Sequence, residues 1–452
     1  MSRTKISPAR LLAMDLLHEV LTEEATLLDA IEDADDLHVS GRDRALAHEI
    51  ARGTCRNLGP IRYLLNRLAP RMGDFPDAVR RILELSAYQL LYLDRVPAYA
   101  VLSDAVELAR HWRCGGLSGA VNGILRNLQR KGGSMGLPLA DDGIEDYLSI
   151  TLSHPRWLVR QWLSERGAEQ TQQLCQFNNQ RAPLMLRLRM PLNEALQALQ
   201  EFGIEAKPHG ALPNCVVIQP GNHPKDDDFF DHPGWVIQDG AAMLVGFAAG
   251  AQPGWRVWDV CAAPGGKTAH LADQMRDEGL LLATDRNEMR MERVCDIAER
   301  LELSIVQPNV LDVLSDSIDY VVESGPFDLV LVDAPCTGLG TFRRHPDLRW
   351  RLHPNDAQRL GQQALQMLES VAPLVKPGGY LLYSTCTLSA EENRQAAQRF
   401  LAQNSGFESD SLRGRIPESF DAAITPEGWL EIDPPTWKLD GMFAARFRKK
   451  TS

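Results

Sequence analysis

Apolar runs alternate with amphipathic runs between residues 256 and 384, and this alternation limits the possible folds more than any other feature. Strand-like runs are expected at residues 256–260, 280–284, 327–332 and 380–384, and helical runs at residues 268–276, 288–301 and 355–375. Continuously apolar strands joined by helices are typical of a parallel sheet that is covered on both faces. Residues 241–452 are therefore predicted to form an α/β domain.

The preceding part of the chain has a different pattern. Leu12, Leu16 and Val20 recur at helical spacing, and similar spacing continues to residue 128, so residues 1–135 are predicted to be all-helical. Residues 145–240 mix both patterns, and we expect them to form a small α+β unit. Its helices are expected at residues 157–166 and 192–202, and its strands at residues 184–189 and 215–219.

Length and composition narrow the class of protein. A chain of 452 residues is expected to hold about three domains. Its apolar runs stay well below the ~20 residues that a membrane-spanning helix needs, and no apolar secretory segment follows the start of the sequence. The eight cysteines contain no C-x-x-C pair, which argues against a zinc site and against a disulfide framework. We expect a cytoplasmic protein with reduced thiols and no metal.

The distribution of charge matters more than its sum. A net charge of −12 opposes a general affinity for nucleic acid, because phosphate binding needs local positive potential. A basic stretch nevertheless lies between residues 42 and 71, and it includes Arg42, Arg44, Arg52 and Arg56. Arg52 and Arg56 share one face of a predicted helix. The stretch is either an RNA-binding surface or an ordinary solvated helix face.

The run DVCAAPGGKT at residues 259–268 follows the first predicted strand and opens the next helix. Its glycines allow a tight turn close to a ligand, with helix amides available to an anionic group. A nucleotide-triphosphate P-loop would need glycine where this chain has Cys261, and the fingerprint G-x-G-x-x-G is also absent. Asp285 ends the second strand, where a carboxylate either accepts hydrogen bonds from ribose hydroxyls or caps a helix. Asp312 follows a third strand-like segment and is a weaker candidate for an adenine contact.

Two cysteines follow later strands of the same predicted sheet. Cys336 lies in the run DAPCTG, and Cys386 lies in the run STCT. A free cysteine is usually a small buried apolar residue. Both cysteines, however, follow polar strand ends, Asp333 in one case and Ser384 in the other, and a reactive thiolate needs such a partly polar, partly exposed place. Since open α/β sheets carry their chemistry at strand ends, both thiols are candidate catalytic groups.

Two further clusters have ordinary alternatives. The run RRHP contains Arg343 and Arg344, and it either holds a phosphate or lies in a solvated loop. Glu391, Glu392 and Asn393 are interpreted as the first turn of a helix, where acidic side chains suit the helix dipole.

With these motifs in this order and spacing, the chain resembles the RsmB (Fmu/Sun) family of bacterial ribosomal RNA cytosine-5 methyltransferases over nearly its whole length. The resemblance rests on CAAPGGKT, on DAPCTGxGxxRRxP and on STCTLxxxEN. The helical first domain looks like a NusB-type RNA-binding domain. The family often has Ser where this chain has Thr337 and Thr387, and both residue types keep a hydroxyl.

The resemblance implies an enzyme that uses S-adenosylmethionine, has a Rossmann-like methyltransferase domain and takes 16S ribosomal RNA as its partner. It implies that Cys386 is the nucleophile, that Cys336 serves product release and that Asp333 contacts the cytosine. The implied cofactor contacts are Cys261, Ala262, Ala263, Pro264, Gly265, Gly266, Lys267, Asp285, Asp312 and Asp333.

Three alternatives compete with this interpretation. A DNA cytosine-5 methyltransferase would use the cysteine of the DAPC-like motif, and the second motif around Cys386 argues against it. A non-catalytic RNA-binding assembly factor would not need both cysteines and a complete cofactor loop. A P-loop ATPase is disfavoured by Cys261. The modified nucleotide, the oligomeric state and any protein partner are not indicated by the sequence.

Overall fold

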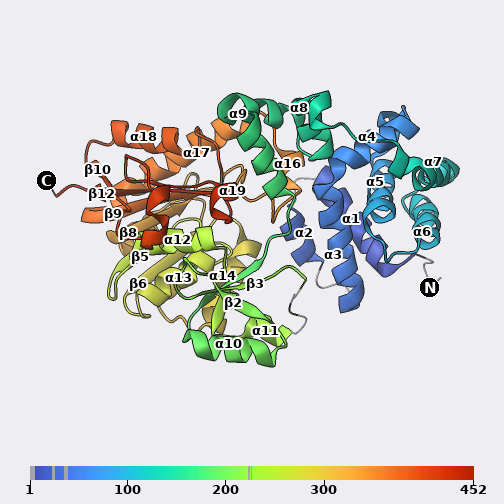
Figure 1. Ribbon diagram of the computed structural model, residues 1–452. Helices are drawn as coiled ribbons and strands as arrows, with labels where there is room; N and C mark the ends of the chain where they lie inside the picture. The colour runs from blue at the N-terminus through green and yellow to red at the C-terminus, as the bar shows by residue number, and fades with distance from the viewer. Residues whose placement is uncertain (1–5, 23–25, 35–38, 222–223, 225–226, 452) are drawn as a thin grey trace. The chain divides into compact units, whose positions relative to one another are not determined.

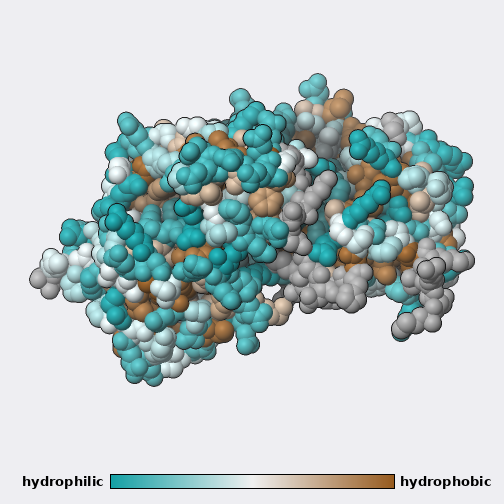
Figure 2. Space-filling view, turned by 90° about the horizontal axis from the view of Figure 1, so that it is seen from below, coloured by the Kyte–Doolittle hydropathy of each residue, from teal (hydrophilic) through white to brown (hydrophobic). Residues whose placement is uncertain are grey.

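The computed structural model describes residues 6–22, 26–34, 39–221, 224 and 227–451 (Figure 1). The chain divides into two compact units, one with Met1–Gln180 and Phe342–Pro354, the other with Arg181–Thr341 and Asn355–Ser452. Among the described residues, no helix is long and apolar enough to cross a membrane. The face shown in Figure 2 is mainly hydrophilic, with apolar side chains scattered over it.

The first unit is helical, as predicted. It contains α1 (Pro8–Thr22), α2 (Leu27–Asp33), α3 (Gly41–Arg56), α4 (Leu58–Leu68), α5 (Asp77–Tyr92), α6 (Ala98–His111), α7 (Ser118–Lys131), α8 (Ile144–Asp146), α9 (Arg156–Asn178) and α16 (Leu348–Arg351). Its short turns are η1 (Met72–Asp74), η2 (Gly115–Leu117), η3 (Gly132–Ser134), η4 (Ala140–Asp142) and η5 (Tyr147–Thr151).

Helix α5 is the centre of this unit. Val79, Ile82 and Leu83 are fully buried on it, and the helix contacts α1, α3, α6 and α7. A helix with apolar residues around most of its circumference must lie in a core rather than at a surface. The polar Gln89 on the same helix is accommodated because its Oε1 accepts a hydrogen bond of 2.7 Å from the buried Arg10.

The segment Phe342–Pro354 belongs to the helical unit although it follows a strand of the other unit in the chain. Arg349 is fully buried, and its Nη1 donates to the Ser153 carbonyl at 3.0 Å. The Trp350 ring nitrogen donates to the Cys55 carbonyl at 2.6 Å, and Asp347 accepts from the Leu27 amide at 3.1 Å. These bonds join residues that are 196 to 320 positions apart, so no local sequence pattern indicates them.

The second unit begins with a small antiparallel sheet of order β2-β3-β1-β4. Its elements are β1 (Leu184–Leu188), α10 (Leu192–Glu201), β2 (Ala206–Pro208), β3 (Cys215–Ile218), α11 (Asp227–Asp231) and β4 (Trp235–Ile237). Leu186, Val216 and Trp235 form its core with Leu199 of α10. The predicted strands at 184–189 and 215–219 and the predicted helix at 192–202 therefore match β1, β3 and α10. Residues 145–180, which we expected to join this small unit, lie in the helical unit instead.

The large sheet has the order β10-β12-β9-β8-β5-β6-β7, with β11 paired to β12. Its strands are β5 (Arg256–Asp259), β6 (Leu280–Asp285), β7 (Val306–Val310), β8 (Phe327–Asp333), β9 (Val375–Thr385), β10 (Phe407–Asp410), β11 (Leu430–Ile432) and β12 (Met442–Lys449). Strands β5 to β9 pair in parallel, as the sequence predicts. Strand β12 pairs antiparallel with β9, β10 and β11, so the sheet is mixed rather than purely parallel.

Helices cover both faces of the large sheet (Figure 1). They are α12 (Gly240–Ala249), α13 (Gly266–Gln274), α14 (Glu288–Arg300), α15 (Asp319–Ser324), α17 (Asp356–Val371), α18 (Arg394–Gln403) and α19 (Pro434–Trp437), with turns η6 (Ala372–Leu374) and η7 (Glu418–Ala423). Consecutive strand residues point to opposite faces. Leu382 accordingly packs in the core that contains Leu271 of α13, and Leu381 in the core that contains Leu368 of α17.

The carboxyl ends of the parallel strands meet at one edge of this sheet. Asp259, Asp285 and Asp333 are the last residues of β5, β6 and β8. In the ladder, Asp333 is the partner of Ser384, two residues before Cys386. The fold thus brings the ends of separate strands to the place where open α/β sheets bind ligands.

Candidate active site

The two candidate thiols lie together at this edge. Cys336 is in the loop after β8, and Cys386 immediately follows β9, the neighbouring strand. Their Sγ atoms are 3.3 Å apart, and both side chains are partly exposed. Adjacent parallel strands therefore turn two cysteines that are 50 positions apart into one thiol pair.

Asp333 anchors the polar side of the thiol pair. Its Oδ2 accepts a hydrogen bond of 2.6 Å from Lys267 Nζ, and its Oδ1 accepts one of 2.6 Å from Ser384 Oγ. Lys267 comes from the first turn of α13, so this ion pair connects the loop after β5 with the end of β8. Lys267 was predicted as a cofactor contact; the structure places it on the same carboxylate that was predicted to contact the cytosine.

The charges around the two thiols differ. The pKa of Cys336 lies well above its ordinary value because the thiol is hydrogen-bonded to Cys386 and because the surrounding protein shields much of it from water. Burial opposes the charged form of Lys267, but the Asp333 carboxylate outweighs it and raises the pKa of this lysine. The site therefore keeps a proton on Cys336 and a positive charge on Lys267 beside Asp333.

The prediction for Glu391, Glu392 and Asn393 was wrong. Helix α18 begins after them, and Glu392 is only 1% exposed. Its carboxylate accepts hydrogen bonds from the backbone and hydroxyl of Thr337 at 2.7 and 2.6 Å, and the Thr387 hydroxyl lies 3.2 Å from it. Burial raises the pKa of Glu392 to about 7, although these bonds favour its charged form. An acid just before a helix has the same sequence pattern whether it faces water or a buried loop, so only the tertiary structure separates the two cases.

Asn393, like Glu392, forms hydrogen bonds to the loop that carries Cys386. Its side-chain amide donates to the Thr387 carbonyl at 3.0 Å, and its Oδ1 accepts from the Thr385 hydroxyl. The loop that carries Cys386 is therefore held from both sides by a segment that directly precedes α18.

The predicted cofactor loop connects β5 to α13. Gly265 has φ = 102°, in the left-handed region, and a Cβ there would lie 3.3 Å from the Val294 Cα. Only glycine takes this conformation without strain. Asp285 accepts a hydrogen bond of 3.3 Å from the Ala263 amide, which places the loop beside the end of β6. The same turn contains the predicted loop residues Cys261, Ala262, Pro264 and Gly266. Burial raises the pKa of the Cys261 thiol well above its ordinary value.

Asp259 and Asp312 complete the acidic groups at this edge. Asp259 is fully buried; its Oδ2 accepts from the Thr268 hydroxyl at 2.8 Å, while its Oδ1 has no hydrogen-bond partner among the described residues. Burial raises its pKa to about 7. Asp312 follows β7, is partly exposed and accepts from the Leu314 amide at 3.0 Å. A buried carboxylate oxygen without a partner is an acceptor for a ligand with a hydrogen-bond donor.

The predicted RNA-contacting arginines all lie in the helical unit. Arg42 is exposed at the start of α3, and Arg44 is partly exposed on its first turn. Burial lowers the pKa of Arg52, and Arg56 donates to the Arg343 carbonyl at 3.4 Å. Arg343 is 4% exposed, and its guanidinium lies 4.3 Å from the centre of the Phe177 ring. Arg344 is partly exposed. Their contacts with RNA stay a prediction.

No cluster of three or more His, Cys, Asp or Glu side chains with the arrangement of a metal site occurs in the part of the chain that the structure describes.

Models of three known protein families match successive parts of the chain. A family model described as 16S rRNA methyltransferase RsmB/F matches residues 249–448. The NusB family model matches residues 7–130, and a ferredoxin-like domain model of RsmF/B-type methyltransferases matches residues 154–222.

Relatives match over the whole length. The chain is 33% identical to the probable ribosomal RNA small subunit methyltransferase B of Bacillus subtilis, with 100% of both chains covered. It is 34% identical to the corresponding probable protein of Synechocystis, with 98% of this chain and 99% of that one covered. The ribosomal RNA small subunit methyltransferase B of Shewanella oneidensis is 31% identical, with coverage of 98% and 99%.

Solved structures show the same architecture. The crystal structure of PH0851 has a TM-score of 0.80 and 25% identity, and it covers 98% of this chain and 99% of its own. A methyltransferase homolog protein from Pyrococcus horikoshii has a TM-score of 0.55 and 25% identity, with 67% of this chain and 97% of its own covered.

These likenesses confirm the resemblance that the motifs indicated, and they confirm the predicted fold class: a NusB-like helical domain, a small middle unit and a Rossmann-like methyltransferase domain. The chain therefore belongs to the RsmB family of ribosomal RNA small subunit methyltransferases.

Proposed function

We propose that this protein methylates carbon 5 of a cytosine in 16S ribosomal RNA, with S-adenosylmethionine as the methyl donor and a covalent Cys386–cytosine adduct as the intermediate. The observation that carries the proposal is the thiol pair, 3.3 Å between Sγ atoms, beside the Asp333–Lys267 ion pair. The names of the relatives support the choice of small-subunit ribosomal RNA as substrate.

A thiolate solves the chemical problem of this reaction. Carbon 5 of cytosine is a poor nucleophile, and addition of the Cys386 sulfur to carbon 6 makes carbon 5 enamine-like. Carbon 5 then forms a bond to the transferred methyl group while the sulfonium–methyl bond breaks. A base next removes the carbon 5 proton, the carbon 5–carbon 6 double bond re-forms, and the electron pair of the sulfur–carbon bond returns to Cys386.

The surroundings of the thiols support different roles for them. The raised pKa of Cys336 keeps this thiol protonated at neutral pH. Cys386, directly after the end of β9, is therefore the better candidate for the nucleophile. Cys336 lies close enough to exchange a proton with the departing Cys386 sulfur, which suits a role in product release.

Asp333 suits the contact to the base. A carboxylate has about four lone-pair positions, and Lys267 and Ser384 use two of the four on Asp333. The others are available to a donor on the cytosine edge. A hydrogen bond near the ring nitrogen would stabilise the adduct, because charge develops there when the thiolate adds.

The cofactor loop fits S-adenosylmethionine in three respects. Gly265 lets the backbone turn closely at the end of β5, Asp285 lies at the end of β6, and the buried Asp259 Oδ1 lacks a partner among the described residues. A carboxylate at the second strand end suits ribose hydroxyls, and a buried acceptor suits an ammonium group. When bound, the cofactor would supply an electrophilic methyl group.

Replacing Asp285 with Ala is expected to weaken S-adenosylmethionine binding by ~1–3 kcal/mol, because a charged hydrogen-bond acceptor is lost. Isothermal titration calorimetry of the full-length protein measures this change. Asp296→Ala, an exposed acid on α14, removes the same charge and is the matched control. Equal affinities for the two variants would refute the assignment of Asp285.

A further inference from the structure

A single buried carboxylate joins the two loops that carry the thiols. Thr337 follows Cys336, Thr387 follows Cys386, and their Oγ1 atoms are 2.6 Å apart. Each hydroxyl has one hydrogen, so the closest contacts are satisfied when Thr387 donates to Thr337 and Thr337 donates to Glu392. The Thr337 amide donates to the other oxygen of Glu392 at 2.7 Å. All three side chains are at most 4% exposed.

Outside this network, backbone hydrogen bonds join the same two segments: the Ala334 amide donates to the Ser384 carbonyl at 2.9 Å, and the Gly340 amide to the Cys386 carbonyl at 3.0 Å. These bonds fix the backbone on either side of Cys336, and the network adds a contact at Thr337, the residue next to this thiol. Burying a carboxylate is unfavourable unless its hydrogen bonds are made. Glu392 receives two from Thr337, and the Thr337 hydroxyl in turn accepts one from Thr387, so the carboxylate is linked to both loops. The network therefore responds to any relative movement of the loops.

We propose that Glu392 is a positioning residue, which with Thr337 and Thr387 fixes the distance between the two thiols so that attack by one and release by the other act on the same base. The inference rests on the proposed function and deepens it. Misplacement of a reacting group by about 1 Å can lower a rate by ~100-fold. Release should suffer more than attack, because release needs both thiols in place whereas attack needs only Cys386.

The test compares Thr337→Val and Thr387→Val with Thr337→Ser and Thr387→Ser in the full-length protein. Valine keeps the shape of threonine and removes the hydroxyl, whereas serine keeps the hydroxyl. We expect roughly a 10- to 100-fold lower kcat for the valine variants, with an unchanged KM for S-adenosylmethionine, and near-normal kcat for the serine variants. A covalent protein–RNA complex should accumulate on a denaturing gel in Thr337→Val. Glu392→Gln should show the same accumulation.

Thermal unfolding and cofactor affinity exclude a general folding defect, and the serine variants supply a folded comparison if valine is poorly tolerated. Wild-type kcat and no accumulated complex in folded Thr337→Val and Glu392→Gln would overturn the positioning role. A wild-type protein that forms no 5-methylcytosine at all would instead overturn the proposed function, so the two failures are distinguishable.

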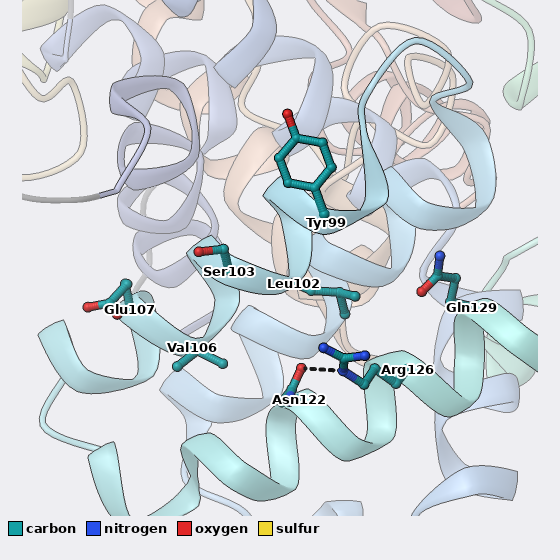
Figure 3. A pocket seen from close by; sticks show the side chains of 8 residues that line it. All are labelled: Tyr99, Leu102, Ser103, Val106, Glu107, Asn122, Arg126 and Gln129. Atoms are coloured by element: carbon teal, nitrogen blue, oxygen red, sulfur yellow. Dashed lines mark hydrogen bonds between the residues drawn. The ribbon is translucent and has the colours of Figure 1, made fainter.

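In the helical unit, side chains of helices α6 and α7 line an open cavity of about 400 Å³ (Figure 3). Its lining residues are Tyr99, Leu102, Ser103, Val106, Glu107, Asn122, Arg126 and Gln129. The first five come from α6 and the last three from α7. Tyr99 is 78% exposed, more than the other exposed large apolar side chains of the described residues.

The chemistry of this cavity suits one kind of ligand. An exposed aromatic ring is a stacking surface for an unpaired base, and the Gln129 amide offers both a donor and an acceptor to its edge. The Asn122 oxygen accepts a hydrogen bond of 3.2 Å from Arg126, which leaves its amide hydrogens as donors (Figure 3). Helix α7 carries Arg126, Arg130 and Lys131 and no acidic residue, although the whole chain has a net charge of −12. Only Leu102 and Val106 are apolar among the lining residues, which is too little for a docked amphipathic helix.

We infer that the cavity between α6 and α7 binds a single-stranded segment of RNA, with a base stacked on Tyr99 and a phosphate near Arg126. This second inference also rests on the proposed function, because it identifies where the helical domain would hold the substrate. The site is distinct from the basic stretch that begins at Arg42, and it combines base stacking with charge.

Binding of transcribed 16S ribosomal RNA to the full-length protein at several salt concentrations tests it. Tyr99→Ala should weaken binding by roughly 5- to 150-fold with an unchanged salt slope. Arg126→Gln should weaken binding and reduce the slope of log affinity against log salt by about one, because one phosphate contact is lost. Arg399→Gln, an exposed arginine on α18, removes the same charge and should change little.

If the wild-type protein binds the RNA and both cavity variants bind it equally well, the cavity is not an RNA site. The inference would also be overturned if the protein bound another protein more tightly than it binds the RNA, and if Tyr99→Ala abolished that protein–protein binding. A wild-type protein without measurable affinity for the RNA would contradict the proposed function itself.

Discussion

Cys386→Ala is expected to reduce methyl transfer to 16S ribosomal RNA below roughly one thousandth of the wild-type rate, because carbon 5 is not activated without the nucleophile. Formation of a covalent protein–RNA adduct should be lost as well. Transfer of a labelled methyl group to RNA measures the first effect, and a denaturing gel measures the second. The raised pKa of Cys336, which keeps that thiol protonated, is the structural reason to expect this role for Cys386 rather than for Cys336.

Cys295→Ala is the matched control for this experiment. Cys295 is an exposed cysteine on α14, so its loss should leave both readouts unchanged. Methyl transfer by Cys386→Ala at the rate of Cys295→Ala would show that the thiol does not carry the reaction.

Cys336→Ala is expected to have the opposite effect on the adduct. Attack and methyl transfer stay possible, but release slows when the proton-carrying thiol 3.3 Å from Cys386 is removed. The covalent protein–RNA complex should therefore accumulate to a stable band on a denaturing gel, while multiple-turnover methylation falls by roughly 100-fold or more.

The two cysteine variants together separate the RNA-type assignment from the DNA-type alternative. Adducts that persist in Cys386→Ala and vanish in Cys336→Ala would reverse the two roles. In that case the cysteine of the DAPC motif would be the nucleophile.

The strands and helices that form the edge of the large sheet with the two thiols could be predicted from sequence, because each has a strong local pattern. The predicted strand at residues 327–332 corresponds to β8 at Phe327–Asp333, and the predicted helix at 288–301 to α14 at Glu288–Arg300. The strand is a nearly continuous apolar run, as a strand buried on both faces should be, and the helix has apolar residues at helical spacing. Once those strands are parallel neighbours, Cys336 and Cys386 must lie at the same edge.

The antiparallel part of the sheet could not be predicted in the same way. Strands β10 and β11 contain four and three residues, too few for a period to be recognised, and β12 pairs with strands on both sides. The membership of Phe342–Pro354 in the helical unit depends on contacts such as Trp350 to Cys55, which are 295 positions apart. Long-range contacts of this kind leave no signal in a single sequence.

Within the site, the closeness of the two thiols and Asp333 could be predicted from the sequence, whereas the residues that hold their loops could not. The motifs identify Cys386, Cys336 and Asp333 as candidates because all three lie at or just after the ends of strands in one predicted sheet. Glu392 was interpreted as a helix-turn acid, and its real surroundings, Thr337 and Thr387, come from the loops after two other strands. A supporting residue is defined by its neighbours in space rather than by its own chemistry.

The central claim is that the methyl group reaches carbon 5 of cytosine. It is tested most directly by incubating the full-length protein with 16S ribosomal RNA and S-adenosylmethionine that carries a labelled methyl group, followed by digestion to nucleosides, chromatography and mass spectrometry. The label is expected in 5-methylcytidine with wild-type protein and in no nucleoside with Cys386→Ala. Label in N4-methylcytidine or in a different nucleoside, or 5-methylcytidine formed equally by Cys386→Ala, would contradict the account.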